Sequence, residues 1–200
     1  MTAYGNFCED IALEIFIDAT LVKFQKGKMR KHDEFAKIHV PVDGSDSMIE
    51  KRFVDVSKEA DLYDLELFIV ARDYDNQPIA QYPKYLKERK FKLDIRVRNK
   101  TVFCIPVKCV EYWLFYVKHM DDTTPPQPNS LESDTNFNCA KAKSDVYERP
   151  LDEDGKYIKQ AARIEVAKAI KILEKLDIKR LKILSPSYDN FIGQLQKVKL

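Results

Sequence analysis

The sequence predicts an α+β protein whose body is an antiparallel β-sheet or β-sandwich, followed by a helical C-terminal segment. The first part of the chain is rich in β-branched and aromatic runs joined by short polar connections. An acidic, proline-containing stretch follows, and apolar residues at helical spacing come after it. We therefore expect a β-rich body over residues 1–118, an acidic arm or linker over residues 119–155, and a helix–strand–helix over residues 156–200 that packs on the body.

Seven segments of the body have the composition of strands. Phe91–Arg98 is the clearest, because apolar residues at its odd positions alternate with charged residues at its even positions. Pro106 interrupts the last run, which indicates a bulge or a strand exchange. Trp113 is expected in the core, and residues 75–77 are expected to form a turn. The expected strands are Ile11–Phe24, Phe35–Val42, Arg52–Val56, Asp64–Tyr74, Phe91–Arg98, Thr101–Ile105 and Val107–Val117.

The segment after the body changes in composition. Between Asp121 and Asp154 there are nine acidic residues against three basic ones. Three prolines fall within four positions at its start, namely Pro125, Pro126 and Pro128. This composition favours an extended arm or a loosely ordered linker.

The C-terminal segment has the periodicity of a helix followed by a short strand and a second helix. The strand is expected at Arg180–Leu184, and Pro186 ends it. Ser187 is expected to cap a final helix that carries Phe191, Ile192 and Leu195. Apolar residues recur at spacings of three and four over Tyr157–Leu176, at Ile158, Ala162, Val166, Ala169, Leu173 and Leu176.

Missing motifs exclude several classes of enzyme. The chain has five glycines, and no two lie within ten positions of each other. A Walker phosphate loop, a G-x-G-x-x-G dinucleotide turn and a G-x-S-x-G nucleophile elbow all need clustered glycines, so none is present. The three histidines form no H-E-x-x-H. We therefore expect no cofactor and no metal site.

The cysteines and the N-terminus indicate the compartment. Cys8, Cys104, Cys109 and Cys139 include no C-x-x-C pair, which suggests reduced and mostly buried thiols in the cytoplasm. The N-terminus carries Glu9 and Asp10 where a signal peptide would be cationic or apolar. No apolar run is long enough to span a bilayer, so an intracellular protein without a membrane span is expected.

Charged residues are distributed in blocks. Lys23–Lys31 holds five bases and no acid, and Lys84–Lys100 holds eight bases against two acids. A basic sheet face with neighbouring aromatic residues is suited to nucleic acid, whereas a solvated face balanced by acidic neighbours or by an acidic partner is the alternative. The acidic stretch Asp43–Glu66 is expected at a surface or an interface. The candidate nucleic-acid-binding residues are Lys23, Lys26, Lys28, Arg30, Lys31, Lys92, Arg96 and Arg98.

Two short stretches resemble the ribonuclease H-like nucleases. The first is Arg163-Ile164-Glu165-Val166 with the strand and helix expected after it, and the second is Leu13-Glu14-Ile15-Phe16-Ile17-Asp18. In that family a strand aspartate and a helix glutamate bind magnesium, so the resemblance implies Asp18 and Glu165 as ligands. The family has a further aspartate after the later strand, and this chain has Pro186 at that position.

The leading hypothesis from the sequence is a non-enzymatic structural or interaction protein. Blocks of opposite charge suit subunit contacts, because complementary patches fix register and orientation. Such a protein assembles with itself or with a protein partner, as a virus- or phage-type component does. The alternatives are a nucleic-acid-binding protein that uses the basic face and a divalent-metal-dependent, ribonuclease H-like nuclease.

Overall fold

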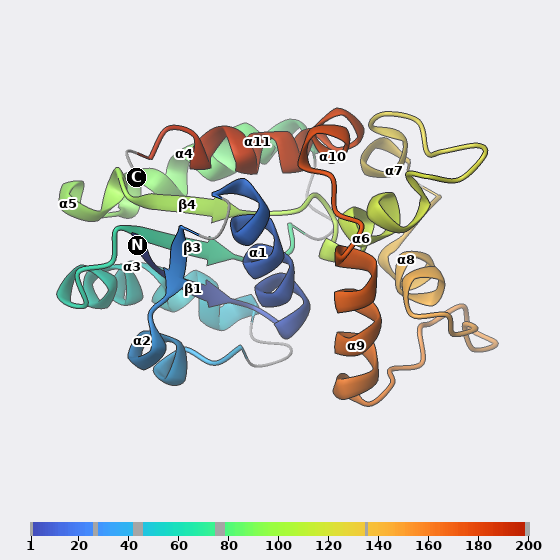
Figure 1. Cartoon of the computed structure of the whole chain (residues 1–200), viewed down its shortest axis with the longest axis horizontal. Coiled ribbons are helices and arrows are strands. Elements are labelled where there is room, and N and C mark those ends of the chain that lie inside the picture. Colours follow the sequence, from blue (N-terminus) through green and yellow to red (C-terminus); the bar gives the residue numbers. More distant parts are fainter. Residues whose placement is uncertain (1, 26–27, 42–45, 75–78, 135, 199–200) are drawn as a thin grey trace.

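Four short strands form one parallel sheet in the computed structural model of the chain (Figure 1). The model describes residues 2–25, 28–41, 46–74, 79–134 and 136–198. The strands lie in the order β2-β1-β3-β4, and every neighbouring pair is parallel. The fold is therefore α/β, and the antiparallel sheet or sandwich expected from the sequence is wrong. The strands are β1 (Thr2–Cys8), β2 (Met29–Lys31), β3 (Leu67–Ala71) and β4 (Thr101–Cys104).

Helices cover both faces of the sheet. β3 shows the consequence most clearly, since Leu67, Ile69 and Ala71 enter one core while Phe68 and Val70 enter the other. A strand buried on both faces has a continuous apolar sequence without alternation. One face packs on α1 (Ile11–Phe24), α6 (Val110–His119), α9 (Ala162–Leu173), α10 (Ile178–Leu184) and α11 (Pro186–Leu195). The other packs on α2 (Asp33–Ile38), α3 (Asp46–Leu62), α4 (Tyr82–Lys92) and α5 (Ile95–Arg98), and the turn η1 (Ile79–Gln81) precedes α4.

The segment expected as the first strand is helix α1. Asp10 caps it, because its carboxylate accepts the backbone N–H of Leu13 at 2.9 Å. The buried residues of α1 recur at helical spacing, at Leu13, Phe16, Ile17, Thr20 and Leu21. The β-branched composition of this segment suggested a strand, but the cap and the packing of this stripe determine a helix.

The segments Phe91–Arg98 and Val107–Val117 are also helical. Phe91–Arg98 contains the end of α4 and all of α5, where Asp94 accepts the N–H of Arg96. Its odd positions do not share one face, since Phe91 is 63% exposed whereas Val97 is buried. Val107–Val117 becomes α6, whose side chains are buried on nearly all sides, so the sequence carries no clear helical period. Phe35–Ile38 lies in α2 and Arg52–Val56 lies in α3, residues 39–41 follow α2 without regular structure, and Val42 lies outside the described residues.

Other expected elements agree with the structure. β3 lies within Asp64–Tyr74, β4 within Thr101–Ile105, and α9 within Tyr157–Leu176. The final helix α11 is present, although Ser185 rather than Ser187 caps it.

Two further elements differ from the expectation. Arg180–Leu184, expected as a strand, lies in α10, and β1 was not expected at all.

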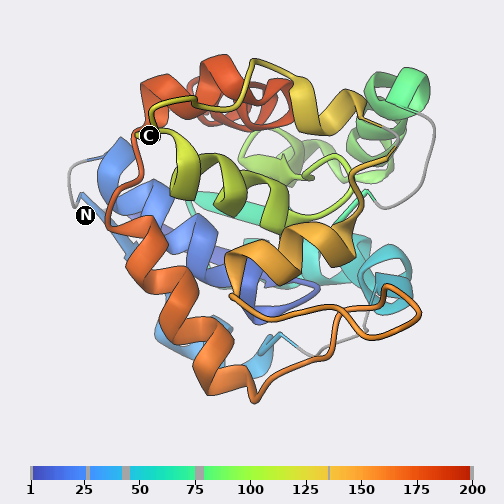
Figure 2. The same cartoon turned by 90° about the vertical axis from the view of Figure 1, so that its right-hand side faces the viewer.

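The acidic region contains two helices, α7 (Ser130–Ser133) and α8 (Cys139–Val146). Leu131, Ala142 and Val146 are buried in the same core as α1 and α6. Figure 2 views the molecule from the side where the strands end, and it shows α8, α6 and α9 lying across that side. This region therefore helps to cover the carboxyl edge of the sheet.

Gly5 occupies a position in β1 where a side chain has no room. A Cβ atom there would lie 2.5 Å from Leu65 Cδ1 and 2.6 Å from Phe35 Cδ1. We expect Gly5→Ala to lower the free energy of unfolding by about 1–3 kcal/mol through overpacking. Gly193→Ala is the control, because a Cβ atom at Gly193 meets nothing within 4 Å. Urea unfolding of both variants measures the effect, and equal stability of the two would contradict it.

Candidate functional site

The carboxyl ends of β1 and β3 bring polar residues to the centre of one sheet edge. Glu9 and Asp10 follow β1, and Arg72 and Asp73 follow β3. These strands are neighbours, but their connecting helices leave toward opposite faces, with α1 on one face and α4 on the other. In open α/β sheets, ligands bind in the crevice at such a switch point.

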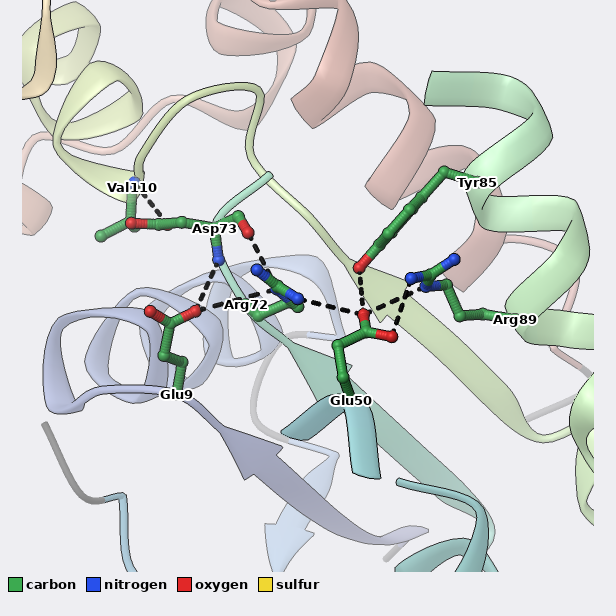
Figure 3. Close-up of polar contacts among 7 residues, drawn as sticks. All are labelled: Glu9, Glu50, Arg72, Asp73, Tyr85, Arg89 and Val110. Carbon is green, nitrogen blue, oxygen red and sulfur yellow. Dashed lines mark hydrogen bonds and ion pairs between the residues drawn. The ribbon is translucent and has the colours of Figure 1, made fainter. Parts of the chain in front are cut away.

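Asp73 is fixed at this edge by two hydrogen bonds (Figure 3). Its Oδ1 accepts the N–H of Val110 at 3.0 Å, at the beginning of α6, and its own N–H donates to Glu9 Oε2 at 3.1 Å. Burial raises the pKa of Asp73 well above its ordinary value, and the nearby charges of Asp10 and Glu111 raise it further. A buried carboxyl with such a pKa is common at functional sites.

Beside Asp73, the side chain of Arg72 links two carboxylates (Figure 3). Arg72 Nη1 donates to Glu50 Oε1 at 3.1 Å, and its Nε lies 4.0 Å from Glu9 Oε2. Glu50 also accepts hydrogen bonds from Tyr85 and Arg89. This network joins α3 and α4 to the end of β3, so it holds the edge in place.

A small polar cavity of about 60 Å³ lies at the same edge, on the side of α1. Three carboxyl groups, two lysines and one tyrosine contribute its polar lining. They come from the beginning of α1, from α6, from α8 and from the region of α9. These residues are Asp10, Glu111, Lys143, Tyr147, Lys159 and Glu165.

Glu111 is the most constrained residue of this cavity. It is 2% exposed, and its Oε1 accepts the hydroxyl of Tyr147 at 3.2 Å and lies 3.7 Å from Lys143 Nζ. Its Oε2 is buried and has no hydrogen-bond partner in the described part of the chain. Burial raises the pKa of Glu111, and the charge of Lys143 opposes that rise. The charge of Glu111 in turn raises the pKa of Lys143, so the ammonium stays protonated.

A second cavity of about 310 Å³ adjoins this one along α9. Lys168 lies in its wall while the next residue, Ala169, lines the small cavity. Lys168 Nζ donates to the backbone carbonyl of Tyr147, a residue that lines the small cavity. This hydrogen bond therefore connects the walls of the two cavities. Four lysines line the larger cavity, and we call it the lysine groove: Lys118, Lys168, Lys171 and Lys175.

The two residues that the nuclease resemblance implied do not lie together. Asp18 is on α1, about two turns beyond Asp10, and binds Tyr4, Asn6 and Lys31. Glu165 does line the small cavity, but its Oε1 accepts the hydroxyl of Tyr157 and the N–H of Gln160. The structure therefore gives Asp18 and Glu165 separate hydrogen-bond partners and does not bring them together as a ligand pair. The stretch expected to supply the later strand is helix α10.

The basic strand face expected over Phe91–Arg98 is not formed, because this segment is helical. Lys92, Arg96 and Arg98 lie on α4 and α5, where Arg98 donates to the carbonyls of Phe91 and Leu93. Of the N-terminal group, Lys23 donates to the carbonyls of Glu174 and Leu176, and Lys31 pairs with Glu14 and Asp18. Lys28 and Arg30 are exposed near β2, and Lys26 lies outside the described residues.

Sequence reasoning missed Asp10, Asp73 and Glu111. Asp10 and Asp73 come two residues after the ends of β1 and β3, and Glu111 is the second residue of α6. These positions are informative only if the strands are parallel and end at one edge. Within the described ranges, no group of three or more His, Cys, Asp or Glu side chains is placed to hold a metal ion by itself. The described helices also include none with the length and apolar character needed to cross a membrane.

Comparisons of the chain with protein-family models, with curated proteins and with solved structures find no match.

The raised pKa of Asp73 has a consequence for stability. A folded state that holds a proton more tightly than the unfolded chain is favoured at low pH, and this contribution is lost as the pH rises through the folded pKa. We therefore expect Asp73→Asn, which keeps the acceptor for Val110 N–H, to gain stability relative to wild type between pH 4 and pH 8. Thermal unfolding across this pH range measures this gain, and a constant difference would contradict it.

Proposed function

We propose that the protein is a divalent-cation-dependent phosphodiesterase that acts on nucleic acid at the carboxyl edge of its sheet. The observation that carries the proposal is the buried Glu111 carboxyl, which lines the same cavity as Asp10 and whose Oε2 has no hydrogen-bond partner among the described residues. Leaving a buried charged oxygen unsatisfied is costly, so a ligand is the physical reason for keeping it. A cation that prefers oxygen ligands satisfies it directly.

Two carboxylates are enough for such a cation. Magnesium keeps several waters and is commonly bound by one or two carboxylates together with the phosphates of the substrate. Asp10 and Glu111 supply these carboxylates in our proposal, and the substrate completes the site. This accounts for the lack of a preformed three-ligand cluster among the described side chains.

Lys143 gives the site a counter-charge that can be exchanged. Its ammonium lies 3.7 Å from Glu111 Oε1, and its side chain is 34% exposed. With a cation held by Glu111, Lys143 would be able to turn toward the phosphate. Its charge would then stabilise the negative charge that develops as the oxygen of water bonds to phosphorus, the P–O bond to the leaving group breaks and the proton of the water passes to solvent.

The lysine groove supports a polymeric anion as the substrate. Lys118 Nζ lies 3.1 Å from Asp145 Oδ1, and Lys168 Nζ lies 3.6 Å from Glu148 Oε2, so both lysines have acidic partners. Lys171 and Lys175 are exposed, and the structure shows no carboxylate partner for them in the residues that it describes. Lys171 lies roughly 9 Å beyond Glu165 along α9, at 1.5 Å per residue, and in our proposal it binds backbone phosphate of the polymer.

Cleavage of labelled oligonucleotides tests the proposal. Single-stranded RNA and DNA are each incubated with the protein and Mg²⁺ or Mn²⁺, and with EDTA in parallel. We expect cleavage with the cations and none with EDTA. Absence of cleavage of both polymers, and of the small diester bis(p-nitrophenyl) phosphate, with either cation would refute the function.

The lysine groove is tested separately by Lys171→Glu/Lys175→Glu. This variant is expected to raise KM for oligonucleotides at least about 10-fold, because contacts to phosphate supply most of the non-specific affinity for nucleic acid. Hydrolysis of the small diester should stay within twofold of wild type, since that substrate does not reach the groove. Equal loss for both substrates would show that the groove does not bind the polymer.

Assembly through charged surfaces, the leading hypothesis from the sequence, stays as the second candidate. The observation that favours it is a second basic groove, which lies beside the start of β4 and is lined by Lys87, Lys90 and Lys197.

A further inference from the structure

A large groove runs along the free edge of β4, away from the carboxyl-edge site. Its volume is about 710 Å³, and it lies between α4 and α5 on one side and α11 on the other. Thr101 and Phe103 of β4 line it, together with Lys100, which precedes the strand. It therefore lies beside the start of β4, whereas Asp10 and Asp73 follow the ends of β1 and β3. We call it the edge groove.

The edge groove is strongly basic. Five basic residues line it against one acidic residue, Glu66, whose Oε2 accepts the N–H of Ala3. Asp61 forms ion pairs with two of the basic residues. Its Oδ1 lies 2.8 Å from Lys100 Nζ, and its Oδ2 lies 3.9 Å from Arg96 Nη1. For the other three, the structure shows no carboxylate partner among the residues that it describes. These three are Lys87, Lys90 and Lys197.

The backbone of β4 in this groove is bonded as if a further strand lay beside it. The side-chain amide of Gln194 on α11 accepts the N–H of Phe103 at 3.0 Å and donates to the carbonyl of Phe103 at 3.1 Å. These are the two hydrogen bonds that a residue of an antiparallel neighbouring strand would make. A side chain therefore protects the exposed edge of the sheet, which would otherwise pair with other chains.

We propose that the edge groove binds an acidic peptide in an extended conformation, which displaces the amide of Gln194 and adds a strand to the sheet at β4. Main-chain hydrogen bonds to Phe103 supply the pairing, and acidic side chains of the peptide reach Lys87, Lys90 and Lys197. Nucleic acid fits this groove less well, because single strands are held by stacking on exposed aromatic rings. The one aromatic residue in the described lining is Phe103, which is 2% exposed.

The test uses a fluorescent octapeptide of alternating glutamate and valine, with an alternating lysine–valine peptide and oligouridylate as comparison ligands. Binding is followed by fluorescence anisotropy. We expect the acidic peptide to bind and the basic peptide not to bind. Oligouridylate bound more tightly than the acidic peptide at the edge groove would overturn the proposal.

Matched variants on one helix locate the binding. The double substitution Lys87→Glu/Lys90→Glu is expected to weaken binding of the acidic peptide at least 10-fold. Lys84→Glu/Lys92→Glu changes the same charge on α4 outside the groove and should change binding less than twofold. Lys197→Glu gives an independent substitution near α11, and circular dichroism verifies the fold of each variant. Equal weakening by both pairs on α4 would overturn the edge groove as the site.

Gln194→Ala separates strand pairing from charge attraction. Removing this amide frees the N–H and C=O of Phe103, so we expect the acidic peptide to bind 3- to 10-fold more tightly. In the complex with wild type, the amide of Phe103 should remain protected from hydrogen exchange when Gln194 is displaced, and a peptide with alternate N-methylated residues should not bind. Unchanged affinity in Gln194→Ala together with normal binding of the N-methylated peptide would refute strand addition.

Discussion

Glu111→Gln is expected to reduce cation-dependent cleavage at least about 100-fold, because it removes a cation ligand and leaves the shape of the cavity unchanged. The glutamine carbonyl can still accept the hydroxyl of Tyr147, which donates to Glu111 Oε1 in the wild type. Steady-state cleavage of an oligonucleotide with Mg²⁺ measures the effect. Activity within threefold of wild type would show that Glu111 does not hold the cation.

Stability measurements distinguish this role from a structural one. Glu111→Gln removes a buried charge that has an unsatisfied oxygen, but it also leaves Lys143 with less compensation. We expect these effects to offset each other within about 1 kcal/mol. The double variant Glu111→Gln/Lys143→Met removes both charges and should be at least as stable as wild type while remaining inactive. A double variant that unfolds readily would instead indicate that the pair is structural.

Glu50→Gln is expected to give the largest loss of stability among conservative substitutions at this edge. The carboxylate of Glu50 accepts hydrogen bonds from Arg72, Tyr85 and Arg89, and both guanidinium groups are largely buried. Without the negative charge, Arg89 loses its ion pair with Glu50, and Arg72 keeps Glu9 at 4.0 Å but loses the closer of its two carboxylates. Breaking such a pair costs about 3–5 kcal/mol when fully buried, and partial exposure here lowers the expected loss to about 2–3 kcal/mol.

The pH dependence of this loss follows from the pKa of Glu50. Burial alone would raise that pKa, but hydrogen bonds from Tyr85 and Arg89 and the charge of Arg72 lower it overall. A lowered folded pKa stabilises the protein above the unfolded pKa, and the stabilisation disappears as the pH falls through the folded value. The difference between Glu50→Gln and wild type should therefore be large at pH 7 and should decrease as the pH falls below about 4.5, the ordinary pKa of a glutamate.

Glu88→Gln is the control for Glu50→Gln. Glu88 also lies in the α4 region of the surface, but its side chain is 52% exposed and 3.8 Å from Lys84. Exposed pairs contribute little, so we expect a change below about 0.5 kcal/mol in chemical unfolding. Equal losses in the two variants would contradict the stabilising role of the Glu50 network.

The sequence predicted elements whose own composition determines them. β3 and β4 are short apolar runs, and α9 has a clear helical stripe. β1 was missed because a central strand of a parallel sheet is normally apolar, whereas this one contains Gly5 and Asn6. Both are explained by tertiary contacts, since Phe35 and Leu65 pack over Gly5, and Asn6 donates to Asp18.

The candidate site was less predictable than the fold. Glu165 was singled out, and it does line the cavity, but its carboxylate is used by Tyr157 and Gln160. Asp10 and Glu111 are separated by about a hundred residues, and only the parallel order of the strands brings them to one edge. The basic residues of Lys84–Lys100 were recognised as a group, yet their common groove depends on α11 from the other end of the chain.

Diffraction from crystals grown with Mn²⁺ and a phosphorothioate oligonucleotide tests the central claim most directly. We predict an anomalous peak in the small cavity, about 2.0–2.5 Å from carboxylate oxygens of Asp10 and Glu111, with Lys143 turned toward the phosphate. Bound oligonucleotide with no Mn²⁺ in this cavity, and with Lys143 still paired with Glu111, would contradict the claim.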